Sequence, residues 1–283
     1  MENKLPSPIL ITGAARSGTS LTAGIINICG AFGGQMSGPN KNNPKGMFEN
    51  AAIRNNILKP YLRWLGVDHL GQYPLPDVNN MTIPNDWRAR VEQVFMNEGY
   101  QSGPCFYKGA KMALTWPVWD YAFPDAKWII VRRKTGDIVR SCINTGFMAV
   151  FGRTNFQKAV GVKTELDGWI WWVNQHLKRF QEMEDAGLNI KTIWPDKLIN
   201  SDYGQIRKIV EWLGLEYKRD EIKEFIDPLL WNARTNSCPV CKGRFNHRGF
   251  KSEYFNITLC SKGCHITHKK KINLNKRKIA MEV

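Results

Sequence analysis

The sequence has no long uncharged apolar segment and no pattern typical of an export signal. A helix that crosses a membrane needs about 18 or more consecutive apolar residues, and no such run occurs among the 283 residues. The N-terminal segment MENKLPSPILITG holds one short apolar stretch, without the longer apolar core and cleavage site of a secretory signal. These absences argue against a membrane span and predict a cytoplasmic protein.

Acidic residues are few, and they are scarcest near the C-terminus. The chain has 25 Asp and Glu against 40 Lys and Arg, a formal net charge of +15. From Arg234 onward, twelve Lys or Arg stand against two acids. Because clustered cations attract polyanions, this region predicts either a solubilising tail or a surface that binds an acidic glycan or nucleic acid.

The seven cysteines fall into two groups. Three lie in apolar segments and are predicted to be buried thiols: Cys29, Cys105 and Cys142. The other four form two pairs separated by eighteen residues: Cys238, Cys241, Cys260 and Cys264. The spacings are close to those of a four-thiolate zinc site, although the second pair is one residue longer than C-x2-C. A structural zinc ion is therefore predicted, with His247, His265 or His268 as substitutes for one thiolate and reduced thiols or disulfides as the alternatives.

Short apolar runs alternate with segments of helical period. The predicted strands are residues 9–12, 106–108, 127–132 and 188–194, and the predicted helices include 17–30, 50–65, 137–143, 165–183 and 203–215. This alternation predicts an α/β fold, a P-loop-type parallel sheet flanked by helices. Residues 144–163 contain three glycines and little period, which predicts a lid or substrate loop. The expected organisation is an α/β domain over 1–232, a zinc module over 233–268 and a basic tail over 269–283.

The segment ITGAARSGTS has the glycines of a phosphate-binding loop but lacks its lysine. Gly13, Gly18 and Ser20 match the pattern G-x-x-x-x-G-K-[ST], whereas Thr19 occupies the lysine position. Backbone N–H groups in a glycine turn before a helix bind phosphate, but a nucleoside triphosphatase also needs the lysine. The loop therefore predicts phosphate binding without triphosphate hydrolysis, and Arg16 is the nearby cation.

Two motifs together resemble those of the sulfotransferases. RSGTS, starting at Arg16, resembles the family's 5′-phosphosulfate loop, [KR]-S-G-T-[ST]. Arg133, Asp137 and Ser141 match R-x-x-x-D-x-x-x-S, the family's site for the 3′-phosphate. Segments 43–49, 107–133 and 195–215 are similar to further family segments, so the likeness covers roughly residues 9 to 230.

The resemblance implies a bacterial-type sulfotransferase whose donor is 3′-phosphoadenosine 5′-phosphosulfate (PAPS). Such an enzyme moves a sulfuryl group to a hydroxyl or amine of an acceptor by in-line displacement. The residues implied in donor binding are Arg16, Ser17, Gly18, Thr19, Ser20, Arg133 and Ser141. The alternative for the second motif is that Arg132 and Arg133 are only surface cations and that Asp137 is a helix N-cap.

The catalytic candidates are Arg16, Lys108 and Glu49. Positioned cations stabilise the charge that builds on the leaving oxygen, a role implied for Arg16 and Lys108. Cytosolic family members use as base a histidine two residues after the internal lysine, but Ala110 stands there. Glu49 matches the glutamate of the other family branch, with His69 in reserve. The alternatives are that Lys108 is a solvated strand-end lysine and that Glu49 caps the helix beginning near residue 50.

The C-terminal region departs from the family pattern. The basic, glycine-containing loop of cytosolic members is absent in its usual form, although Arg234, Arg244 or Arg248 could replace it. Two other functions also stay open. One is a P-loop nucleotide or small-molecule kinase, and the other is a non-catalytic nucleic-acid-binding protein that uses the zinc module.

Overall fold

The computed structural model describes residues 5–146 and 148–231, followed by 236–237, 244–245, 250–252, 257–259 and 266. The chain divides into two compact units, Met1–Ile226 and Asp227–Val283. The predicted donor-binding and catalytic residues all belong to the first unit. The four predicted zinc ligands and the tail 269–283 lie outside the described residues.

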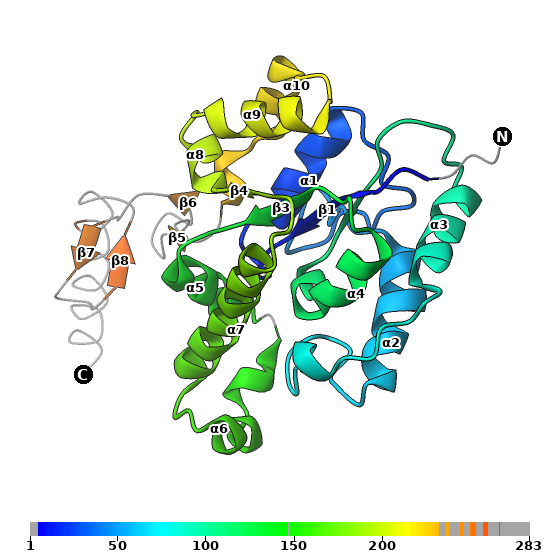
Figure 1. The fold of residues 1–283 in the computed structure, drawn as a ribbon. Helices are drawn as coiled ribbons and strands as arrows, with labels where there is room; N and C mark the ends of the chain where they lie inside the picture. The colour runs from blue at the N-terminus through cyan, green and yellow to red at the C-terminus, as the bar shows by residue number, and fades with distance from the viewer. Residues whose placement is uncertain are drawn as a thin grey trace, which may run out of the picture. The chain divides into compact units, whose positions relative to one another are not determined.

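The first unit is built on a four-stranded parallel sheet in the order β2-β1-β3-β4 (Figure 1). The strands are β1 (Ile9–Thr12), β2 (Phe106–Lys108), β3 (Trp128–Val131) and β4 (Ile190–Ile193). Leu10 of β1 pairs with Tyr107 on one side and Trp128 on the other. The residues of β1, β2 and β3 are all buried, because helices cover both faces of the sheet. The predicted α/β class with a parallel sheet is confirmed.

Alternate strand residues enter two different cores, as the two-residue period of a strand requires. Ile9 and Ile11 pack with α1 (Thr19–Ile28), α8 (Pro195–Ile199), α9 (Gly204–Leu213) and α10 (Arg219–Phe225). Leu10 packs on the opposite face with α2 (Lys59–Trp64), α3 (Trp87–Asn97), α4 (Trp116–Ala122) and α7 (Glu165–Asp185). Helices on both faces therefore leave only the strand ends open to a ligand.

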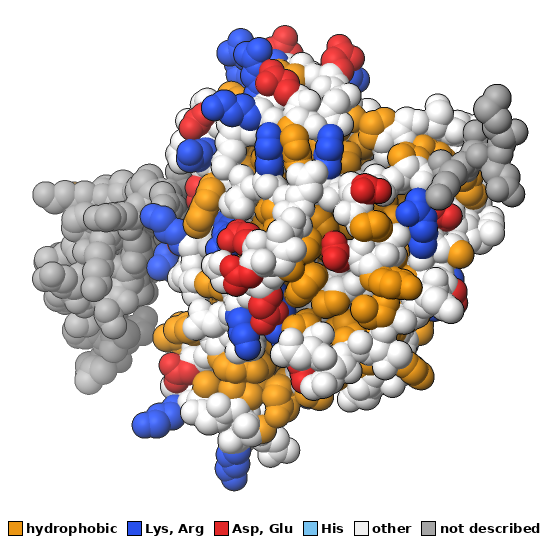
Figure 2. All heavy atoms as spheres, in the orientation of Figure 1, with side chains coloured by type: hydrophobic (Ala, Val, Ile, Leu, Met, Phe, Trp, Pro, Cys, Tyr) orange, Lys and Arg blue, Asp and Glu red, His pale blue; other side chains and the backbone are white. Residues whose placement is uncertain are grey.

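The helices that cover the sheet differ in whether their outer surfaces carry charged or hydrophobic side chains. Figure 2 shows charged side chains of both signs gathered over α8, α9 and α10, and hydrophobic side chains exposed farther down the same face. Among the exposed large hydrophobic residues are Tyr121 of α4 and Leu166 and Ile170 of α7. A charged outer face fits helices that bury their opposite side against the sheet. In the described part of the chain, no helix is both long and apolar enough to span a bilayer.

The prediction of a loop over 144–163 is wrong. Helix α5 (Thr135–Thr145) extends into this segment. The segment also contains η4 (Ala149–Gly152) and α6 (Thr154–Val160). Phe151 and Phe156 bury their rings beside Trp169, which lies with Trp172 in the core. These two buried aromatic residues stabilise the short helices, but two apolar positions are too few to produce a helical period in the sequence.

The remaining elements are short. The helix predicted from residue 50 contains a π-helix, η1 (Ile53–Leu58), which continues as α2. In addition to η4, the 3₁₀ helices of the described residues are η2 (Val78–Asn80), η3 (Ala110–Thr115) and, in the second unit, η5 (Pro228–Leu230). The second unit also has two antiparallel pairs, β5 (Asn236–Ser237) with β6 (Arg244–Phe245) and β7 (Phe250–Ser252) with β8 (Ile257–Leu259).

The packing of α7 against residues 144–163 can be tested at Gly168. A Cβ at Gly168 would lie 2.9 Å from Cε1 of Phe156 and 3.1 Å from the main-chain oxygen of Phe151. Alanine in place of a helical glycine normally stabilises by up to about 1 kcal/mol, whereas overpacking costs about 1–3 kcal/mol. We expect Gly168→Ala to lower the free energy of unfolding by about 1 kcal/mol, measured by urea denaturation.

Gly136→Ala is the matched control, because Gly136 lies in the first turn of α5 and a Cβ there would meet no atom within 4 Å. This variant should be stabilised by roughly 0.5 kcal/mol. Equal stabilisation by both substitutions would contradict the close contact at α7.

Candidate functional site

The candidate residues meet at the carboxyl ends of β1, β2 and β3. The glycine loop follows β1, Lys108 ends β2, and Arg133 lies two residues beyond β3. Ligands of open α/β sheets bind at this edge, outside the carboxyl ends of the strands. The order of the strands thus places segments that are far apart in the sequence around one site.

The loop between β1 and α1 has the backbone of an anion cradle. Arg16 and Gly18 both adopt left-handed conformations, with φ values of 70° and 103°. Such turns direct successive N–H groups toward one point, and the first turn of α1 adds N–H groups that lack intrahelical acceptors. Gly13 has no room for a side chain, because a Cβ would lie 2.6 Å from the main-chain oxygen of Val131.

Ser17 and Thr19 line this cradle and are buried. The Ser17 hydroxyl is fully buried and has no hydrogen-bond partner among the residues that the structure describes. A buried hydroxyl without a partner is rare in folded proteins. This oxygen is therefore a ready donor to a bound anion.

The second motif contacts the loop directly. Nη1 of Arg133 donates to the main-chain oxygen of Arg16 at 2.8 Å, and Nε of Arg16 donates to Oγ of Ser141 at 3.1 Å. Arg133 and Ser141 are both buried, the latter on α5. The two motifs form one continuous site, with two guanidinium groups beside the glycine loop.

Burial shapes the charge of these arginines. Loss of hydration lowers the pKa of Arg133 to about 10, although the carboxylates of Asp196 and Asp137 oppose the shift. Burial also lowers the pKa of Arg16. A pKa of about 10 leaves Arg133 charged at neutral pH. Two partly buried cations at one point favour the binding of an anion.

The positions of Arg132 and Asp137 bear on the alternative interpretation of the second motif. Arg132 pairs with Glu184 of α7 at 3.0 Å. Asp137 lies in the first turn of α5, where a carboxylate is favourable, but the N-cap position belongs to Lys134. The alternative of Asp137 as an N-cap is therefore wrong.

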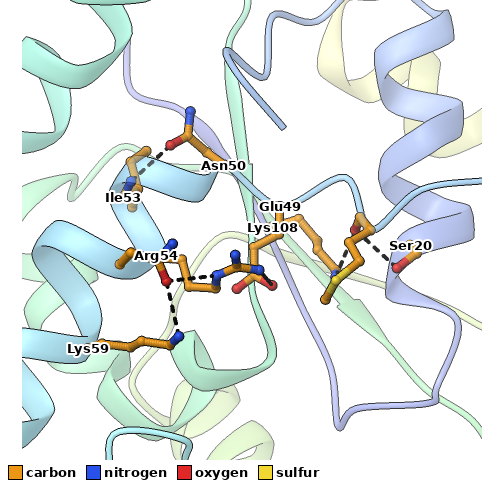
Figure 3. Close-up of polar contacts among 9 residues, drawn as sticks. Ser20, Glu49, Asn50, Ile53, Arg54, Lys59 and Lys108 are labelled. Carbon is orange, nitrogen blue, oxygen red and sulfur yellow. Dashed lines mark hydrogen bonds and ion pairs between the residues drawn. The ribbon is translucent and has the colours of Figure 1, made fainter. Parts of the chain in front are cut away.

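Lys108 is buried rather than solvated. Its Nζ donates to the main-chain oxygen of Met47 at 3.1 Å, and Oγ of Ser20 donates to the same oxygen at 3.1 Å (Figure 3). Burial lowers the pKa of Lys108, and the carboxylate of Glu49 opposes this effect. The Met47 carbonyl thus links the lysine at the end of β2 to the first turn of α1.

Glu49 is buried beside this lysine. Its Oε2 lies 3.6 Å from Nη1 of Arg54, while its Oε1 is buried without a hydrogen-bond partner in the described part of the chain. The helix that follows is not capped by Glu49, since Oδ1 of Asn50 accepts the N–H of Ile53 at 2.9 Å. Glu49 therefore has an oxygen available to a ligand.

The sequence did not reveal Tyr107, whose hydroxyl belongs to the same corner. A Cβ on Gly109 would lie 3.3 Å from the Tyr107 hydroxyl and 3.4 Å from Oε1 of Glu49. Burial and the Glu49 charge raise the Tyr107 pKa well above its ordinary range. As an aromatic residue in a buried strand, Tyr107 has the pattern of a core residue, and no sequence signal marks its hydroxyl.

Other candidates lie apart from this corner or outside the described residues. His69 is about one third exposed in a loop, with Nδ1 3.7 Å from Oδ1 of Asp68. Cys29, Cys105 and Cys142 are buried free thiols, as predicted. Within the described residues, no group of three or more His, Cys, Asp or Glu side chains is placed to hold a metal. The zinc site stays a prediction, because its four cysteines lie outside those residues.

The burial of Lys108 is expected to make the stability of the protein depend on pH. Because burial lowers its pKa from the ordinary 10.5, the unfolded chain binds a proton that the folded protein lacks between the lowered value and 10.5. Wild-type stability gains from this group as the pH rises through that window. We expect the stability of Lys108→Met relative to wild type to be greatest near pH 7 and to decline toward about pH 10.

Chemical denaturation of both proteins across this range measures the difference. Lys208→Met, at an exposed position on α9, controls for the loss of one positive charge. A difference for Lys108→Met that is the same at every pH would contradict a lowered pKa.

Comparison of the sequence with protein-family models and with curated proteins finds no match. Solved structures with a similar chain path include a sulfotransferase from Mycobacterium avium, with 13% identity and a TM-score of 0.45 over 78% of this chain and 67% of that one. A sulfotransferase domain of the Synechococcus olefin synthase has 17% identity and a TM-score of 0.44 over 86% of this chain and 93% of its own. A third, from the curacin biosynthetic pathway, has 16% identity and a TM-score of 0.44 over 80% and 78%. Similarity at this level describes the path of the chain and assigns no activity.

Proposed function

We propose that the protein is a sulfotransferase that moves a sulfuryl group from PAPS to a hydroxyl or amine of an acceptor. The observation that carries the proposal is the direct contact of the RSGTS loop with Arg133 and Ser141. A nucleotide with phosphate groups at its 3′ and 5′ positions needs two anion sites within the span of one ribose. The loop and the second motif provide these sites at a single edge of the sheet.

The residues divide between the two ends of the donor. The N–H groups of the loop and the Ser17 hydroxyl bind the 5′-phosphosulfate, with Gly18, Thr19 and Ser20 at the helix N-terminus. Arg133 and Ser141 bind the 3′-phosphate, because a guanidinium presents several donors to phosphate oxygens. Ser141 now accepts from Arg16, so donor binding replaces this contact and releases Arg16 toward the transferred group.

The remaining residues fit the transfer step. Oε1 of Glu49 takes the proton of the acceptor hydroxyl as the acceptor oxygen attacks sulfur. The new S–O bond forms while the bond between sulfur and the bridging oxygen breaks, which leaves adenosine 3′,5′-bisphosphate and a sulfated acceptor. Arg16 and Lys108 stabilise the charge on the leaving phosphate, as positioned cations do in low-dielectric sites. The proton on Glu49 then passes to solvent.

Donor recognition is tested by calorimetric titration with adenosine 3′,5′-bisphosphate and with ATP. We expect the bisphosphate to bind more tightly, and Arg133→Ala to weaken its binding by about 2–3 kcal/mol because a charged hydrogen bond is lost. That loss corresponds to roughly 30- to 150-fold in Kd.

Arg132→Ala is the matched control, since Arg132 neighbours Arg133 in sequence but pairs with Glu184. This variant should bind the bisphosphate like the wild type. Equal or tighter binding of ATP would contradict the proposal and favour the kinase alternative.

The role of Glu49 is tested by transfer of labelled sulfate from PAPS to a panel of phenols, glycans and amines. Glu49→Gln should lose at least about 100-fold in turnover, the usual contribution of a general base, and keep its affinity for adenosine 3′,5′-bisphosphate. Glu211→Gln, exposed on α9 and paired with Arg207, serves as the control. Full turnover by Glu49→Gln would assign the proton transfer to another group.

A further inference from the structure

Cations gather on the side of Glu49 that faces away from the glycine loop. Arg54 lies 3.6 Å from the Glu49 carboxylate, and its Nε donates to Oδ1 of Asn55 at 3.3 Å. Nζ of Lys59 donates to the same Asn55 oxygen at 3.0 Å (Figure 3). One neutral amide oxygen therefore holds two cations together. We refer to Arg54 and Lys59, together with Lys111, which interacts electrostatically with Lys59, as the cation cluster.

The backbone of η1 is what brings Arg54 and Lys59 together. The N–H of Lys59 donates to the main-chain oxygen of Arg54, five residues earlier, as in a π-helix. In an α-helix of 3.6 residues per turn, residues five apart point to different sides. The wider π turn stacks them, and such turns occur frequently at functional sites. The local structure thus places two like charges side by side.

The electrostatic interactions of Lys59 are mainly with other cations. Burial lowers the pKa of Lys59, and Arg54, Lys111 and Arg63 lower it further, against the opposing effect of Glu49. Lys111 and Arg54 also lower the pKa of Lys108. The carboxylate of Glu49 thus attracts both Lys59 and Lys108, whereas Arg54 and Lys111 repel both lysines. Like charges held together in a half-buried setting cost free energy, and a bound anion would recover this cost.

Arg54 and Lys59 lie on the side of the predicted base that is opposite to the proposed donor site. Figure 3 shows Ser20 on one side, Glu49 and Lys108 in the middle, and Arg54 and Lys59 on the other side. The contacts of Ser20 and Lys108 with Met47, and of Glu49 with Arg54, connect these groups in that order. The donor occupies the Ser20 end, so the Arg54 end is left to the acceptor.

We propose that the acceptor is itself an anion, and that Arg54 and Lys59 bind its carboxylate or sulfate ester group. Its hydroxyl or amine then lies at Oε1 of Glu49. The planar guanidinium of Arg54 presents paired donors to such a group, and the ammonium of Lys59 supplies a compact charge. The inference rests on the proposed function, because it assigns the substrate class of the same site.

The first test measures anion binding without any assumption about the acceptor. The protein is saturated with adenosine 3′,5′-bisphosphate, and its thermal midpoint is followed with sodium sulfate and with sodium chloride at equal ionic strength. We expect the half-saturating sulfate concentration to rise about tenfold in Lys59→Gln and Arg54→Gln, as for the loss of a charged hydrogen bond. Lys208→Gln, at an exposed position on α9, should respond like the wild type.

General salting-out by sulfate acts on all four proteins alike, so only the difference between variants counts. An unchanged sulfate response in both Lys59→Gln and Arg54→Gln would overturn the inference.

The second test compares labelled sulfate transfer to matched acceptor pairs. 4-Hydroxybenzoate is paired with its methyl ester, and 4-hydroxyphenyl sulfate with 4-methoxyphenol, so that the two arms separate a carboxylate from a sulfate ester. We expect a charged member to be preferred by about tenfold in kcat/KM, and the preference to fall toward one in Lys59→Gln but not in Lys208→Gln.

The outcomes separate the two proposals. Equal kcat/KM for charged and neutral members overturns the anionic acceptor and leaves the sulfotransferase proposal intact. A protein that binds no adenosine 3′,5′-bisphosphate overturns the proposed function itself. Where none of these phenols accepts sulfate, the sulfate titration alone decides the inference.

Discussion

The hydrogen bond from Arg133 to the main-chain oxygen of Arg16 is the contact on which the site depends. It joins the segment after β3 to the loop after β1. Strands β1 and β3 are neighbours in the sheet. A guanidinium that leaves water needs compensating partners, and a carbonyl in a left-handed turn supplies one without adding a counter-charge. The guanidinium therefore fixes the loop, and the carboxylates of Asp196 and Asp137 favour its charged form. Ser141 and the glycine loop take their relative positions from this contact.

The sheet could be predicted from the sequence because buried parallel strands leave continuous apolar runs. The run in β3 and the arginine pair after it were visible, and the motif spacing selected Arg133 over Arg132. The helices α8 and α10 were missed because each buries only one or two apolar side chains of its short length. With so few anchors, no period emerges, and tertiary contacts alone define these helices.

The corner formed by Lys108, Glu49 and Tyr107 could be predicted only in part. Lys108 and Glu49 were found from their places in motifs, but their burial and the orphan oxygen of Glu49 depend on tertiary packing. The proximity of Arg54 to Lys59 could not be predicted from the sequence, because helical patterns assume 3.6 residues per turn. Pro60 falls inside the helix predicted over residues 50–65, and just before it the chain widens into η1. Proline lacks an N–H and its ring clashes with the carbonyl four residues earlier, and a wider turn relieves both problems.

In the acceptor site that we propose, the wide turn of η1 would make the length of this helix a determinant of specificity. A π turn amounts to one residue more than an α turn needs, so deletion of a single exposed residue such as Asn56 would let the helix become regular. Arg54 would then rotate by about 100° relative to Lys59, since each residue of an α-helix turns by that angle. The sheet, the glycine loop and the donor pocket would stay in place. Relatives of this fold could thus exchange one class of acceptor for another by a change of one residue in length, with every charged side chain retained.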